Sequence, residues 1–304
     1  MDREDIVSSY RVAEFVTLAR DGSPVCWPML PGFERGRLLF STGYMYPTKA
    51  RNARRDPRVA ALFSDPSASG RSDDDPLVLV QGLAEVFDDD IQRNTERYVD
   101  QLMRKSLAFR LMLSIPWVRQ AMAGYLARIW IEVTPTRERV WERHSAPPDA
   151  LREAGRPEAF VPGPGIALPE RALQWARRYA RPPVLSYVGP DGWPGITRVD
   201  AALHPGHVDI RSDLMSVEGA PACLTYHRLI GNYRANDAFL IRGHFDGEGR
   251  LIPEKLVGYG GMSDDRGVGS LKLLRAMRDW GERLPAKLAR EDRSAVVVRP
   301  SPQR

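Results

Sequence analysis

One short segment, residues 47–58, concentrates the residues best suited to bind an anion. It carries a single acid, Asp56, and five cations, Lys49, Arg51, Arg54, Arg55 and Arg58. Thr48 is a suitable helix N-cap, and Pro57 would end the helix about two turns later. Backbone N–H groups and cations in the first turn of a helix together attract phosphate. The segment therefore predicts a phosphate-binding helix, and the alternative is a basic helix face that contacts only solvent.

Strand-like runs flank this helix and must position it. Residues 12–18 and 25–30 lie on either side of Asp21-Gly22, a dipeptide typical of a tight hairpin turn. The other strands are expected at residues 37–42, 59–63, 76–87 and 127–133, the last of which ends at Thr134-Pro135. Residues 88–125 have a helical pattern. Six short strands around one helix indicate a small antiparallel barrel.

The second half of the chain repeats the first. Asp21-Gly-Ser-Pro24 corresponds to Asp191-Gly-Trp-Pro194, and residues 38–42 correspond to 208–212 at the same spacing. Two further matches follow in the same order, of residues 59–63 with 222–226 and of residues 79–82 with 240–243. Because the order is kept, we predict two copies of one barrel.

The composition places the boundaries of the two copies. Residues 1–143 hold the first barrel with its helical insertion, residues 144–168 form a linker rich in Pro, Gly and Ala, and residues 169–304 hold the second, degenerate barrel. A C-terminal helix over residues 270–284 is expected to pack on the second barrel, because Leu271, Leu274 and Met277 recur at helical spacing.

The two copies differ at the basic segment. Between its third and fourth strands the second copy has Leu214–Pro221, which contains no Lys or Arg. Glu218 in that segment would repel a phosphate. Only the first copy is therefore expected to bind an anion.

Several motifs of the first copy together carry a family resemblance. They are Phe15–Pro24, Trp27–Leu30, Leu39–Thr42, Lys49–Val59 and Val80–Val86. With them, residues 12–90 resemble the flavin- and deazaflavin-binding split β-barrels of the pyridoxamine 5′-phosphate oxidase-like superfamily, and residues 183–250 match more loosely. The resemblance implies a mainly β fold with helices (α+β), made of two split antiparallel β-barrels in tandem. It also implies a cofactor groove where two barrels meet, so the two copies are expected to pack as a pseudo-dimer within one chain.

The resemblance further implies which residues bind the cofactor. Lys49 and Arg51 would neutralise its phosphate, and Asn52 lies beside them in the same motif. The hydroxyls of Ser41 and Thr42 would donate hydrogen bonds to that phosphate. The resemblance places Pro28, Met29 and Leu30 against the cofactor ring. It places Gln81 and Gly82 along the groove. From the second copy, Arg198, Arg211 and His227 are candidates to reach the groove.

The function that the resemblance implies is an FMN-dependent oxidoreductase acting on a small molecule. An F420-dependent reductase of the same fold is one alternative, since the arginines also suit the phosphate and acidic tail of F420. A non-catalytic flavin- or haem-binding protein is the other. No catalytic side chain is predicted, because in such enzymes the cofactor ring carries out hydride transfer. Whether two chains form a homodimer is left open.

Composition argues against two other classes of partner. The 304 residues include 44 Lys and Arg against 39 Asp and Glu, a net charge of +5, which is too mixed for a dedicated nucleic-acid-binding surface. The longest apolar stretch is interrupted by charges and a proline, so no membrane span is expected. The charged residues at the start of the chain do not form a signal peptide, and a cytoplasmic protein is expected.

The cysteines and histidines do not predict a metal centre. Cys26 and Cys223 lie in strand-like runs and are expected to be buried thiols. His204 and His207 share a turn, but two ligands without a third do not make a metal site. His227 and His244 flank strands of the second copy and are interpreted as hydrogen-bonded strand-end residues, with haem ligation as the alternative.

Overall fold

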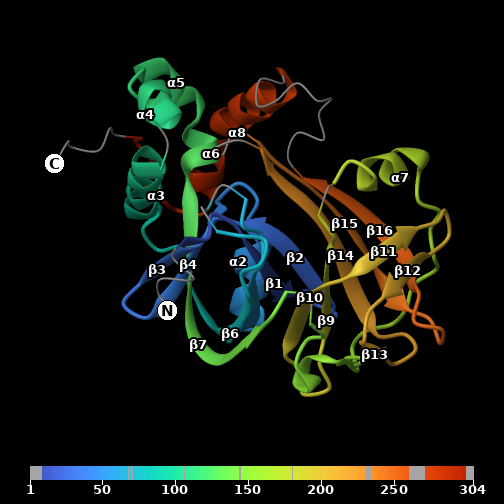
Figure 1. Cartoon of the computed structure of the whole chain (residues 1–304). Helices are drawn as coiled ribbons and strands as arrows, with labels where there is room; N and C mark the ends of the chain where they lie inside the picture. The colour runs from blue at the N-terminus through green and yellow to red at the C-terminus, as the bar shows by residue number, and fades with distance from the viewer. Residues whose placement is uncertain are drawn as a thin grey trace.

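Two seven-stranded antiparallel sheets, each curled into an open barrel, form the body of the protein (Figure 1). The computed structural model describes residues 9–67, 69, 71–105, 107–143, 145–179, 181–230, 235–259 and 271–298. Within this part of the chain, no helix is both long enough and apolar enough to cross a membrane.

The first sheet has the strand order β2-β1-β5-β6-β7-β4-β3. Its strands are β1 (Ala13–Leu18), β2 (Pro24–Met29), β3 (Gly32–Glu34), β4 (Arg37–Gly43), β5 (Arg58–Phe63), β6 (Leu77–Phe87) and β7 (Arg128–Trp141). The predicted helical stretch between the last two strands consists of four pieces, α3 (Ile91–Lys105), α4 (Leu107–Leu113), α5 (Pro116–Ala121) and α6 (Ala123–Leu126). The sheet curls around a core in which the rings of Phe15 and Phe40 stack with their centroids 4.3 Å apart.

The basic helix, α2 (Thr48–Arg55), connects β4 to β5. Its N-cap is Pro47, whose carbonyl accepts the Arg51 N–H at 2.9 Å, so Thr48 is already the first helical residue and makes no capping hydrogen bond. The predicted cap at Thr48 is therefore wrong by one residue. The helix ends at Asp56, which is extended, as the residue before a proline favours.

Strand β7 extends beyond the predicted end of the first barrel. It continues through Pro135 to Trp141, whereas the sequence predicted an end at Thr134-Pro135. Gly82 of β6 pairs with Pro135 while Gln81 pairs with Arg137, so one extra residue is inserted at this point. A β-bulge tolerates a proline because the ladder hydrogen bond is already interrupted there.

The second sheet repeats the first in strand order. The order is β10-β9-β14-β15-β16-β12-β11. The strands are β9 (Val184–Val188), β10 (Pro194–Arg198), β11 (Asp200–Leu203), β12 (Val208–Arg211), β14 (Pro221–Ile230), β15 (Ala235–Phe245) and β16 (Leu251–Tyr259). Its bulge lies between Arg242 and Gly243, where Gly243 pairs with Pro253. The predicted repeat is thus confirmed strand by strand.

The segment between the sheets runs along the second one. It contains β8 (Glu153–Ala154), which pairs in parallel with β13 (Met215–Ser216), and leads to α7 (Glu170–Ala176). The Gly155 N–H donates to the Val188 carbonyl and the Ile166 N–H to the Pro253 carbonyl, both at 2.7 Å. The boundaries proposed at residues 143/144 and 168/169 stay predictions.

The two sheets share an apolar cluster. β2 contacts β14 and β9, and β5 contacts β10. The cluster includes Val16, Cys26 and Leu79 from the first sheet and Ile196, Cys223 and Leu240 from the second. Both cysteines are buried and free, as expected.

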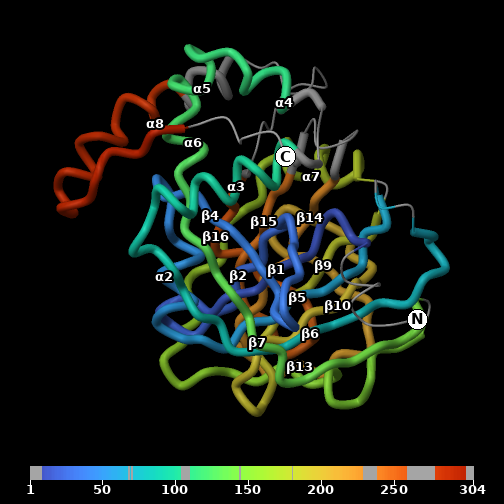
Figure 2. Tube along the Cα trace, turned by 90° about the vertical axis from the view of Figure 1, so that its left-hand side faces the viewer, coloured from blue at the N-terminus to red at the C-terminus, as the bar shows by residue number. Residues whose placement is uncertain are grey.

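The C-terminal helix, α8 (Leu271–Arg290), packs on the helices α5 and α6 of the first barrel (Figures 1 and 2). Leu284 and Leu288 are buried in the core of the first barrel, and Gly124 of α6 meets the backbone of Trp280. The predicted location is therefore wrong; the side chains of residues 271–277, on which it was based, lie outside the described part. Two glycines, Gly124 and Gly281, allow this close helix contact, which spacing within α8 alone could not reveal.

Candidate functional site

Cations of β7 and α8 lie close to cations of α2, Arg128 to Lys49 and Lys287 to Arg51. We call them the α2 basic cluster: Lys49 and Arg51 of α2, Arg128 of β7 and Lys287 of α8. Burial and, secondly, the charge of Arg128 lower the pKa of Lys49 to about 8. Burial also lowers the pKa of Lys287; Glu291 opposes this effect and Arg51 adds to it. The cluster therefore holds like charges close enough to disfavour one another.

Aromatic rings line the α2 basic cluster. The Lys49 ammonium lies 4.5 Å from the centre of the Trp27 ring, and the Lys287 ammonium lies 4.1 Å from that of Tyr44. The Arg128 guanidinium lies over Tyr98 and Tyr125, at 4.0 and 4.6 Å. Ring faces attract cations, so these contacts orient the three side chains.

The other three cations of the basic segment face elsewhere. Arg54 pairs with Asp88 at 2.8 Å, and Arg58 pairs with Asp56 at 2.6 Å. Arg55 donates to the Leu18 carbonyl at 2.7 Å. The structure thus divides the five predicted cations, and only Lys49 and Arg51 belong to the α2 basic cluster.

The polar residues predicted near the phosphate have mixed positions. Ser41 is half-buried on β4, and the Thr42 hydroxyl donates to the Tyr46 carbonyl at 3.5 Å. The Asn52 amide is buried and donates to the Thr17 hydroxyl at 3.1 Å, which ties α2 to β1. Arg51 is exposed on the same helix. Of these four side chains, Arg51 and Ser41 are the ones with open surface.

The residues predicted to line the ring and the groove do not all lie together. Pro28 and Met29 end β2, next to Trp27, and Leu30 follows them. Gln81 instead donates to the Pro194 carbonyl of the second barrel at 2.8 Å, and Gly82 packs against the Thr134 carbonyl at the bulge.

Strand pairing shows how far apart the predicted residues are. Ser41 pairs with Trp130, which in turn pairs with Phe87. Phe87 is six residues from Gln81 along β6, about 20 Å of strand. Along β6, Gln81 therefore lies well away from the level of Ser41, although α2 itself contacts β6.

A buried charge cluster joins the two barrels, and the sequence indicated only part of it. Glu14 of β1 is fully buried, and its Oε1 accepts hydrogen bonds from Arg198 at 2.8 Å and from Ser64 at 2.7 Å. His227 Nε2 lies 2.8 Å from the same oxygen, and Asp65 lies 3.8 Å from His227 Nδ1. We call Glu14, Ser64, Asp65, Arg198 and His227 the inter-barrel charge cluster.

Electrostatics within this cluster favour the charged form of Asp65. Burial alone would raise the pKa of Asp65, but the His227 charge, the Ser67 hydrogen bonds and Arg198 together lower it. Register places the cluster beside the end of β2, because Glu14 pairs directly with Pro28. Arg198 and His227 were candidates from the sequence, whereas the third, Arg211, is exposed on β12.

Glu14, Ser64 and Asp65 were missed from the sequence. A lone acid within the apolar run Ala13–Leu18 was the available signal, because a charge in a strand buried along its whole length needs partners. The interpretation of the strand-end histidines is consistent with the structure, since both meet carboxylates. His227 contacts Glu14 and His244 contacts Glu254, the latter at 2.7 Å.

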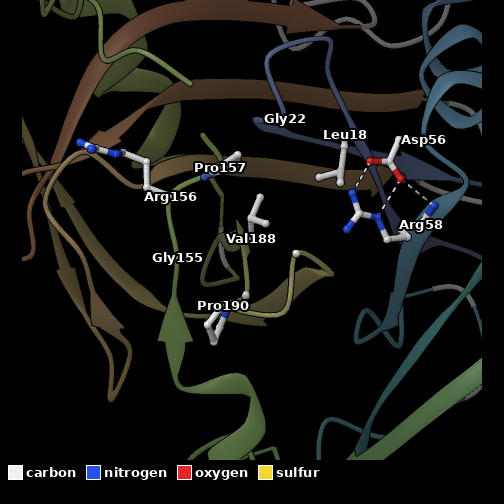
Figure 3. A pocket seen from close by; sticks show the side chains of 11 residues that line it. Leu18, Gly22, Asp56, Arg58, Gly155, Arg156, Pro157, Val188 and Pro190 are labelled. Atoms are coloured by element: carbon white, nitrogen blue, oxygen red, sulfur yellow. Dashed lines mark hydrogen bonds and ion pairs between the residues drawn. The ribbon is translucent and has the colours of Figure 1, made fainter. Parts of the chain in front are cut away.

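A small pocket lies between the two Asp-Gly turns, away from the predicted site. It has a volume of about 140 Å³ and is bounded by Gly22 of one turn, Gly192 of the other, and Pro157 of the connecting segment (Figure 3). Arg58 and Asp56, paired with each other, form another part of its wall. The pocket is too small for a flavin, and none of the ten predicted cofactor residues lines it.

Comparison with solved structures finds similar folds that each match about half of the chain. A conserved hypothetical protein of Mycobacterium tuberculosis is 26% identical over 47% of this chain and 85% of its own, with a TM-score of 0.35. A candidate pyridoxamine 5′-phosphate oxidase of Listeria innocua is 18% identical over 45% and 92%, with a TM-score of 0.31. An F420 reductase is 20% identical over 46% and 97%, with a TM-score of 0.31. No family model and no curated protein matches the chain.

The fold class predicted from the sequence is confirmed. The chain is α+β, with two split antiparallel β-barrels in tandem, each formed by a curled seven-stranded sheet.

Proposed function

We propose that the protein is a flavin-dependent oxidoreductase that binds FMN by its phosphate at the α2 basic cluster. The observation that carries this proposal is the placement of Lys49, which is buried over Trp27 and beside Arg128 on the helix where Arg51 is exposed. Ligand-binding sites often hold charges at such a cost to folding. A phosphate would offset the repulsion among the cations and form charge-assisted hydrogen bonds with them.

The donor set suits a phosphate monoester. In the proposed complex Arg51, exposed on α2, contacts the phosphate, and Lys49 contributes charge from beneath it. The Ser41 hydroxyl, at the end of β4, is a further donor. The ring would lie toward Pro28 and Met29 at the end of β2, close to the inter-barrel charge cluster. FMN, when bound, supplies the hydride-transfer chemistry, and the protein supplies orientation and electrostatics for a small-molecule substrate.

The second barrel supports a stoichiometry of one cofactor per chain. Where the first barrel has α2, the second has β13 and a short loop that contains Glu218 and neither Lys nor Arg. We therefore expect the second barrel to contribute a wall of the groove and not a second phosphate site.

Binding of FMN and riboflavin to wild-type and variant proteins tests this proposal, because the two ligands differ only by the phosphate. We expect quenching of FMN fluorescence with one equivalent per chain. Arg51→Ala should weaken FMN binding about tenfold, roughly 1.4 kcal/mol, and leave the weaker riboflavin binding unchanged. Arg54→Ala is the matched control, because Arg54 is on the same helix but pairs with Asp88.

Other results of the binding experiment would favour a different cofactor or a different function. If the protein binds F420 but not FMN, and this binding depends on Arg51, the cofactor would be F420 and the phosphate site would stay as proposed. Stable FMN binding without reduction by NADH or NADPH under anaerobic conditions would favour the non-catalytic alternative. Failure to bind either cofactor, or binding equally sensitive to Arg54→Ala, would refute the proposal.

A further inference from the structure

The hairpin between β11 and β12 places three metal-ligating residues on one face. His204 and His207 begin and end a turn closed by a hydrogen bond from the His204 N–H to the His207 carbonyl, at 2.9 Å. His207 and Asp209 are two residues apart along the chain, so their side chains share one face of the hairpin. The intervening Val208 points into the core and is fully buried.

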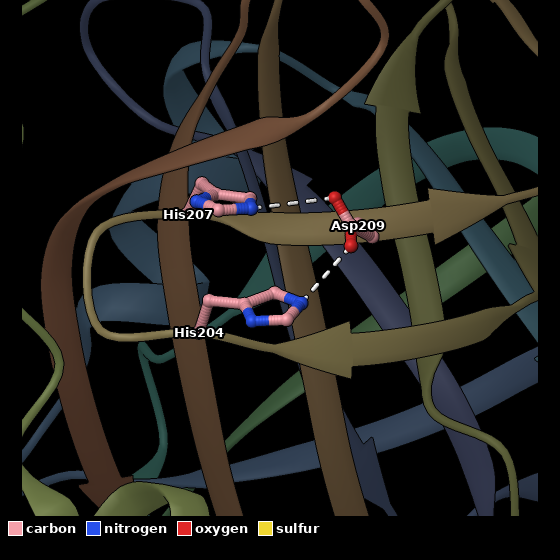
Figure 4. Close-up of side chains that lie close together, drawn as sticks. All are labelled: His204, His207 and Asp209. Atoms are coloured by element: carbon pink, nitrogen blue, oxygen red, sulfur yellow. Dashed lines mark hydrogen bonds and ion pairs between the residues drawn. The ribbon is translucent and has the colours of Figure 1, made fainter.

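The donor atoms of these residues already converge (Figure 4). His204 Nε2 lies 3.0 Å from one carboxylate oxygen of Asp209, and His207 Nε2 lies 3.4 Å from the other. The two imidazole rings stack with centroids 4.6 Å apart, and one ligand atom from each residue lies within 4.8 Å of the other two. Three ligands around one tetrahedral Zn²⁺ would be about 3.3 Å apart, given bond lengths of about 2.0–2.2 Å.

We propose that His204, His207 and Asp209 form a binding site for a divalent transition metal of the Zn²⁺ class. Two imidazoles and one carboxylate favour Zn²⁺, Cu²⁺ or Ni²⁺ over Mg²⁺ or Ca²⁺, which prefer sets of oxygen ligands. Because all three side chains are only half-buried, a fourth position stays open to water or to another ligand. The two histidines alone predicted no site, and the missing third ligand is Asp209, which the strand pairing brings to them.

The first barrel serves as an internal comparison. By the repeat, Glu34, Arg37 and Leu39 occupy the positions of His204, His207 and Asp209. In the first barrel Glu34 pairs with Arg97 and Arg37 pairs with Glu85, so that turn is stabilised by ordinary salt bridges. A hairpin at this place in the fold therefore needs no histidine, and the ligand set is specific to the second barrel.

Arg250, a cation close enough to Asp209 for their charges to interact, is held by other acids. Hydrogen bonding to Asp246 is the main cause that raises the pKa of Arg250, and Asp209 contributes to the same shift. Arg250 itself pairs with Asp246 at 2.7 Å and with Glu248 at 2.8 Å. Its charge is thus already compensated by two acids.

Calorimetric titration of tag-free, chelator-treated protein with ZnCl₂ tests the site. We expect one Zn²⁺ per wild-type chain. Removing one ligand, as in His204→Ala or His207→Ala, should weaken binding at least tenfold, and Asp209→Asn should weaken it because the amide is the poorer ligand. His244→Ala is the matched control, since His244 lies on the same barrel and contacts Glu254 instead. Its affinity for Zn²⁺ should equal that of the wild type.

Two further measurements keep the outcome interpretable. Far-UV circular dichroism identifies any variant that fails to fold, and Asp209→Asn then provides the test with the smallest change of shape. MgCl₂ in place of ZnCl₂ should give no saturable binding. The proposal is refuted if wild-type protein takes up no stoichiometric Zn²⁺, or if the ligand variants and His244→Ala bind it equally well.

Discussion

At the scale of residues, the chain keeps a lysine where burial disfavours its charge. Lys49 is 8% exposed, stands over Trp27 and is close enough to Arg128 for the two charges to repel. A fold under selection for stability alone has little reason to retain such a group. The arrangement is explained if an anion binds next to it for part of the protein's working cycle.

The lowered pKa of Lys49 predicts how stability depends on pH. Its value in the folded protein is about 8, below the ordinary 10.5, so between these values the unfolded chain binds more protons. The free energy of unfolding should therefore rise with pH from about 8 to 10.5 by up to about 3 kcal/mol from this group. Urea unfolding between pH 7 and 10.5 should show a smaller rise for Lys49→Met. Lys255→Met, on the exposed surface of β16, should keep the wild-type rise, and parallel curves for Lys49→Met would contradict the assignment.

At the scale of elements, the two barrels use the same device to continue a strand past a proline. Gly82 opposes Pro135 in the first, and Gly243 opposes Pro253 in the second, each at a register shift. A side chain on either glycine would collide with a backbone carbonyl, that of Thr134 or of Ile252. The motif Leu-x-x-Gly that aligned the two halves is thus a structural requirement of the bulge.

This reading predicts that Gly82→Ala is strongly destabilising. The added Cβ would meet the Thr134 carbonyl and lie 2.7 Å from Val133 Cγ1, so the backbone must move. We expect a loss of about 2 kcal/mol or more in the free energy of unfolding. Gly247→Ala, at a position with open space nearby, should change it by less than about 0.5 kcal/mol. Similar unfolding midpoints for the two variants would show that the bulge can relax.

At the scale of the whole molecule, the two barrels depend on each other. They share an apolar cluster, and the inter-barrel charge cluster links β1 to β10 and β14. Helix α8 returns from the second barrel to close the first beside the α2 basic cluster. The proposed cofactor site therefore includes segments from both ends of the chain.

Because the two barrels share this interface, we expect them to unfold in a single transition. Glu14→Gln should move that whole transition to lower urea concentration. The substitution removes the carboxylate charge that Arg198 and His227 share, while both side chains stay buried. It should lower the free energy of unfolding by about 3 kcal/mol. Glu85→Gln, which removes an exposed partner of Arg37, should cost less than about 1 kcal/mol. Urea unfolding followed by tryptophan fluorescence and by circular dichroism measures both. Two separate transitions, with only one shifted, would mean that the barrels fold independently.

The sequence alone determined the features that depend on local patterns. Short apolar runs indicated the strands, Asp-Gly pairs indicated the two hairpin turns, and their repetition in order indicated the tandem barrels. The basic segment located α2 to within one residue. These predictions succeeded because they rest on backbone preferences and burial periods that act over a few residues.

Only the tertiary structure decided which side chains meet. It divided the five cations of the basic segment, brought Arg128 to Lys49 and Lys287 to Arg51, and moved α8 to the first barrel. It also gave Glu14 its partners and added Asp209 to the two histidines. The physical reason is that strand register and helix docking are set by packing between segments far apart in the sequence, and no local pattern encodes those contacts.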